Sequence, residues 1–76
     1  MSVNYERQKY QEAVVEYELI KAGAEVLLCK MVQSGEIDAD RIAEIGKAIE
    51  SAKGSVSYHE RELKKAEAEE GGSENA

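Results

Sequence analysis

The sequence predicts an all-α fold, namely an antiparallel two-helix hairpin of the coiled-coil type. Three observations support this prediction. The 76 residues include no proline, and Ala, Glu and Lys, which are good helix formers, recur throughout. Apolar residues repeat with heptad spacing in two separate segments, which is typical of helices that pack along one stripe. Between these segments lies a short stretch that contains helix-ending and helix-starting residues.

The first helix is expected over residues 4–33, the turn over 34–38 and the second helix over 39–68, so residues 1–70 form the hairpin. Gly35 is suited to the left-handed conformation that commonly ends a helix. Asp38 is suited to cap the second helix, because its side-chain oxygen can accept a hydrogen bond from a free backbone N–H. Residues 71–76 are small and polar, and we predict a disordered tail there.

The two heptads match when the chain is folded about the turn. Across the facing pairs the two residue numbers add to 72 or 73, and large side chains mostly face small ones, which allows the layers to interdigitate. This register predicts the intrachain seam. Its residues on the first helix are Tyr10, Ala13, Tyr17, Ile20, Ala24, Leu27 and Met31, and those on the second are Ile42, Ile45, Ile49, Ala52, Val56, His59 and Leu63.

The first helix carries a second apolar stripe on the side away from the seam, formed by Val15, Leu19, Ala22, Val26 and Cys29. We call these five residues the outer stripe. A row of exposed apolar side chains on a small protein indicates a binding surface. Antiparallel pairing of the helix with a second copy, centred on Ala22, brings Leu19 opposite Val26 and predicts a homodimeric four-helix bundle. In this pairing the two Cys29 thiols lie about 20 Å apart, too far for a disulfide.

Composition argues against several other classes of function. The net charge is −6, of which −5 falls in residues 36–76, and no basic patch occurs beyond Lys64-Lys65, so direct nucleic-acid binding is not expected. One cysteine and one histidine cannot form an intrachain disulfide or the usual zinc site. We therefore expect no catalytic residue, no cofactor and no metal. The lone thiol and the absence of a signal peptide or an apolar span favour a cytoplasmic protein without a membrane anchor.

Short stretches resemble known helical proteins. The hairpin plan, Ile37-Asp38-Ala39-Asp40 and the acidic tail resemble the Rop-type RNA-binding bundle, although the basic face through which that family binds RNA is missing. Ser34-Gly35-Glu36-Ile37 and Leu63-Lys64-Lys65-Ala66-Glu67 resemble the exonuclease VII small subunit, although the Leu-Glu pattern of its first helix is missing. Met31 to Gly35 and residues 47–52 resemble hairpin co-chaperones of type III secretion.

The leading hypothesis is a small, non-enzymatic structural or regulatory interaction module, such as a small bacterial or phage protein, that self-associates through the outer stripe. One alternative is a co-chaperone or accessory subunit of a larger bacterial or phage complex, which would bind a different helical protein. Another is an acidic nucleic-acid mimic that inhibits a basic partner, which the charge of residues 36–76 would favour.

Overall fold

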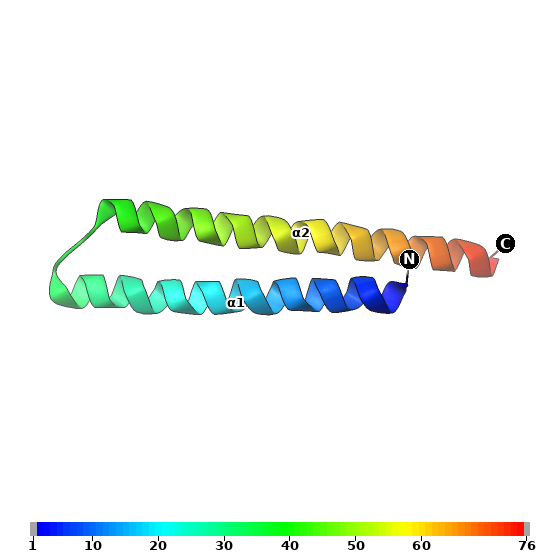
Figure 1. Ribbon diagram of the computed structural model, residues 1–76, viewed down its shortest axis with the longest axis horizontal. Helices are drawn as coiled ribbons and strands as arrows, with labels where there is room; N and C mark the ends of the chain where they lie inside the picture. The colour runs from blue at the N-terminus through cyan, green and yellow to red at the C-terminus, as the bar shows by residue number, and fades with distance from the viewer. Residues whose placement is uncertain (1, 76) are drawn as a thin grey trace.

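The computed structural model describes the backbone of residues 2–75 and the side chains of residues 2–70. Helix α1 spans Val3–Ser34 and helix α2 spans Ala39–Asn75. The helices lie side by side in opposite directions along a rod of 62 × 15 × 14 Å, with both chain ends at the same end of the rod (Figure 1). The predicted all-α hairpin is confirmed, whereas the four-helix bundle stays a prediction.

Local signals at the turn act as the sequence predicts. Gly35 has φ +75°, and its backbone N–H donates to the carbonyl oxygens of Met31 (2.9 Å) and Val32 (3.3 Å), which ends α1 in a left-handed cap. The Oδ1 atom of Asp38 accepts a hydrogen bond from the backbone N–H of Arg41 at 3.1 Å. This bond satisfies one of the free donors at the start of α2. Residues within or beside the turn therefore explain why α1 ends there and α2 begins there.

Most of the side chains that the sequence places in the seam are buried or partly buried, which agrees with the predicted seam. Ala13, Ala24 and Met31 of α1 are buried. The remaining seam residues except Ile42 are partly buried, namely Tyr10, Tyr17, Ile20, Leu27, Ile45, Ile49, Ala52, Val56, His59 and Leu63. Two further residues extend the seam toward the chain ends. Glu6 and Ala66 are both 6% exposed, and their residue numbers add to 72, as those of the predicted seam pairs do.

Ile42 differs from the expected pattern, because it is 39% exposed. It lies in the first turn of α2, where Figure 1 shows the helices farther apart than at the other end. The four-residue connection holds the start of α2 away from α1, so Ile42 is covered on fewer sides than the seam residues farther along.

Helix α2 is longer than we predicted. We expected it to end at about residue 68, whereas its described backbone is helical to Asn75. The disordered tail predicted for residues 71–76 stays a prediction, and Ala76 lies outside the described residues. No proline follows residue 68, so every residue there has the backbone N–H that an i to i−4 hydrogen bond requires. Gly71 and Gly72 weaken a helix without terminating it unless one adopts a left-handed conformation.

The hydrophobic core of the hairpin is thin. Its buried apolar residues are three alanines and one methionine, and among the described side chains no large one is fully buried. Burial of an alanine removes little apolar area from water, whereas burial of a Leu or Ile side chain contributes about 1.5–3 kcal/mol. Most of the large apolar residues of the seam therefore keep part of their surface in contact with water.

Candidate interaction surface

The outer stripe of α1 is exposed to solvent in the structure. Leu19 is 68% exposed, Val15 58% and Val26 54%, and Ala22 and Cys29 are also exposed. Their spacings of four, three, four and three residues place these side chains on one side of α1. The structure thus brings the five residues together on a face that α2 does not cover.

The apolar character of α1 continues toward the turn and is weaker on α2. Leu28 and Val32 are exposed near the end of α1, and Ile37 is exposed within the turn. The corresponding outer residues of α2 are polar or small except for Tyr58, namely Glu44, Lys47, Ser51, Gly54, Tyr58 and Arg61. Exposed apolar surface is therefore concentrated on one of the two helices.

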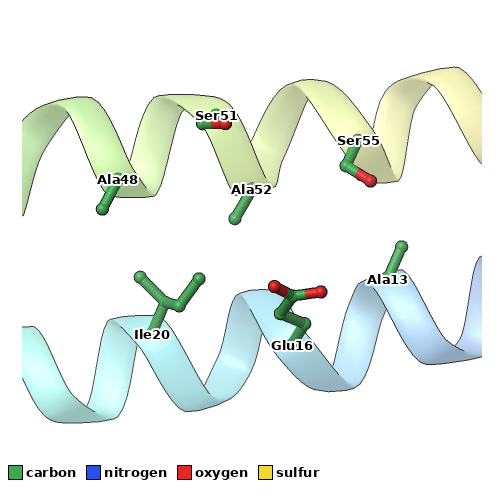
Figure 2. A pocket seen from close by; sticks show the side chains of 7 residues that line it. All are labelled: Ala13, Glu16, Ile20, Ala48, Ser51, Ala52 and Ser55. Carbon is green, nitrogen blue, oxygen red and sulfur yellow. The ribbon is translucent and has the colours of Figure 1, made fainter.

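A hollow of about 370 Å³ lies between the helices near the middle of the rod. Figure 2 shows why it exists: α2 presents only short side chains there, while Ile20 and Glu16 extend from α1 (Figure 2). The lining residues are Ala13, Glu16, Ile20, Ala48, Ser51, Ala52 and Ser55. We call this hollow the central groove. Its walls are mainly apolar or small, and it is open to solvent on one side.

Two further hollows lie on the same side of the hairpin. Lys9, Glu16, Gly23 and Lys30 are spaced by seven residues and form one row along α1, as do Arg41, Ala48, Ser55 and Glu62 along α2. The hollow near the turn contains Lys30 and Arg41, and the hollow near the chain ends contains Lys9 and Glu62. Members of both rows therefore line all three hollows. We call this side of the hairpin the groove face.

The reactive side chains singled out in the sequence lie apart from one another. Cys29 is exposed on the outer stripe, whereas His59 is partly buried in the seam and packs edge-on against Tyr58, with ring centroids 5.1 Å apart. Within the described residues, no group of three or more His, Cys, Asp and Glu side chains is placed to hold a metal ion. Hollows and exposed apolar residues, rather than a cluster of reactive groups, are the distinctive surface features.

No family model, curated protein or solved structure matches this chain. In the part of the chain that the structure describes, neither helix has a segment both long and apolar enough to cross a membrane. A function is therefore inferred from the surface of the hairpin alone.

The groove face was not identified from the sequence, although a signal for it was present. Ala48, Ser51, Ala52 and Ser55 follow each other at spacings of three, one and three, which places four small side chains on one side of α2. The predicted seam includes Ala52, whereas Ala48, Ser51 and Ser55 belong neither to the seam nor to the outer stripe. The hollow forms because these small residues of α2 face the segment of α1 that carries Ala13, Glu16 and Ile20, and their short side chains do not fill the space between the helices.

Proposed function

We propose that this protein is a small interaction module without a catalytic role, and that it associates with a second copy through the outer face of α1. The exposed outer stripe carries the proposal. Several large aliphatic side chains in one row on so small a protein form a patch of the kind that marks binding sites. Burial of each such side chain contributes about 1.5–3 kcal/mol, so covering the stripe supplies a substantial driving force for association.

The thin core supports the same proposal. Domains of this size bury only about 60% of the surface of the unfolded chain, and many depend on disulfides, metals or oligomerisation for stability. With a single cysteine, the chain cannot form an internal disulfide. An assembly of two hairpins would add buried apolar surface where the seam supplies little.

The test is the molar mass of the protein across a dilution series, measured by sedimentation equilibrium. We expect the wild-type protein to dimerise and Leu19→Asp to raise the dissociation constant by about 100-fold or more, because a charge would replace an aliphatic group in the interface. Gln11→Asp is the matched control, since Gln11 is an exposed residue of α1 outside the stripe. Wild-type protein that stays monomeric at high concentration would refute the proposal.

A further inference from the structure

We propose that the second copy docks on the groove face in antiparallel orientation, with the twofold axis beside Gly23, so that both helices of each hairpin enter the interface. This inference rests on the proposed function, and it specifies which surface is covered and in what register. Four features of the structure lead to it: the surface area of the hairpin, the position of the central groove, the charges along the groove face and the position of Gly23.

The accessible surface of the hairpin is large for its mass, so the rod has enough area for a partner. The protein exposes 5758 Å², whereas a compact monomer of 8.4 kDa is expected to expose roughly 4,600 Å². The excess of about 1,100 Å² exceeds the roughly 800 Å² that each partner buries in a stable interface of standard size. One face of a rod of these dimensions can supply such an area, whereas one narrow stripe of a single helix supplies less.

The central groove lies between α2 and the side of α1 that is next to the outer stripe. Leu19 lies three residues after Glu16, which lines the groove, and four residues before Gly23, so Leu19 is next to the groove face. Val26 occupies the same position one heptad later. A second hairpin laid over this face would cover Leu19, Val26 and the groove together. Val15, Ala22 and Cys29 would then lie at the outer edge of the interface.

The twofold register makes the interface charges complementary. When Leu19 of one copy lies opposite Val26 of the other, Glu16 lies opposite Lys30, and symmetry produces this pair twice. Within the described part of the chain, the ion pairs that form involve neither Glu16 nor Lys30. Glu18 and Glu25, which would repel in the same register, lie on the opposite side of the outer stripe from the groove face. This charge pattern favours a second copy over an unrelated partner.

Gly23 and the small residues of α2 allow close approach at the axis. A Cβ atom built on Gly23 would contact nothing within 4 Å, so packing inside the hairpin does not require a glycine there. Within one hairpin, residues of α1 and α2 that lie opposite each other have numbers that add to about 72. An axis beside Gly23 of α1 therefore passes α2 near residue 50. Ala48 of one copy then lies opposite Ser51 of the other, and both side chains are short enough for the two α2 helices to pack.

The register is tested with charge reversals in the full-length chain. We expect Glu16→Lys and Lys30→Glu each to raise the dissociation constant about ten-fold, because two attractive pairs become repulsive. An equimolar mixture of the two variants should recover dimers, since opposite charges face each other again in the mixed pair. The mixture also controls for effects on folding, because each chain keeps its own substitution.

The participation of α2 is tested with a matched pair of serines. Ser51→Glu should dissociate the dimer, whereas Ser57→Glu should not, because Ser57 is also exposed on the same helix but lies outside the groove face. A cross-link gives a second readout: in a Cys29→Ser background, Gly23→Cys should form an intermolecular disulfide under oxidising conditions, whereas wild-type Cys29 should not.

The outcomes separate this inference from the proposed function. If wild-type protein dimerises but the charge reversals or Ser51→Glu leave the dissociation constant unchanged, the groove-face register is wrong and the proposed function stands. Rapid disulfide formation between wild-type Cys29 residues would indicate a parallel pairing and would also overturn the register. A wild-type monomer at all concentrations overturns both.

Discussion

Two glycines in α2 give a direct test of the structure, because replacing them should stabilise the hairpin. Gly46 and Gly54 lie inside α2, and a Cβ atom built on either would contact nothing within 4 Å. A glycine in a helix interior costs about 0.5–1 kcal/mol relative to alanine, because it loses more backbone freedom on folding. Neither residue lies on the groove face, so their replacement should leave association intact.

The expected magnitude follows from additivity. The two sites are eight residues apart and lie about 12 Å apart along the helix, so their effects should add. Gly46→Ala/Gly54→Ala should therefore raise the free energy of unfolding by about 1–2 kcal/mol. For a domain of this size, the midpoint of thermal unfolding should rise by about 5–15 °C.

The assay is thermal and urea unfolding followed by far-ultraviolet circular dichroism, with all variants at one protein concentration because association would stabilise them. Gly35→Ala is the opposite control: Gly35 has φ +75°, where a side chain is strained, so stability should fall by about 1–2 kcal/mol. A lower midpoint for the double variant would refute the reasoning, since it would mean that Gly46 or Gly54 is packed against something that the open surface does not reveal.

Three further substitutions and one control test the hairpin in the same assay. Asp38→Ala should lower the free energy of unfolding by about 1 kcal/mol, because it removes the acceptor for the Arg41 N–H; an unchanged value would contradict the cap. Met31→Ala should cost about 2–3 kcal/mol because Met31 is buried, whereas Val32→Ala, at a site 74% exposed, should stay within about 0.5 kcal/mol; equal losses would contradict the seam. Glu6→Leu should stabilise by about 1 kcal/mol, because Glu6 lies buried beside Ala66 in the seam, and a lower urea midpoint would count against this placement.

Local chemistry explains why the elements of the fold could be predicted. The left-handed cap at Gly35 and the side-chain cap at Asp38 involve residues only a few positions apart, so the sequence specifies them directly. The heptad pattern likewise determines which side of each helix is apolar. The helical backbone of α2 beyond residue 68 was not predicted, because composition gives only a weak signal for where a helix ends when no proline follows it.

The candidate surface was predictable only in part. The outer stripe follows from periodicity within α1, and it is exposed because the residues that the structure describes form no further helix that could cover it. The groove face depends on both helices at once. Ala48 and Ser55 line a hollow only because the fold places them across from Ile20, Glu16 and Ala13 of α1, and an apolar pattern in the sequence does not mark such small residues.

By itself, therefore, the sequence determined two helices, the turn between them and the apolar stripe of α1, since each depends on neighbouring residues or on a single helical period. Only the tertiary structure decided that Glu6 is buried, that Ile42 is exposed and that a groove opens beside Leu19. These features depend on how far apart the two helices lie at each level of the rod. That separation is set by pairs of side chains distant in the sequence, so it appears only once the helices are packed.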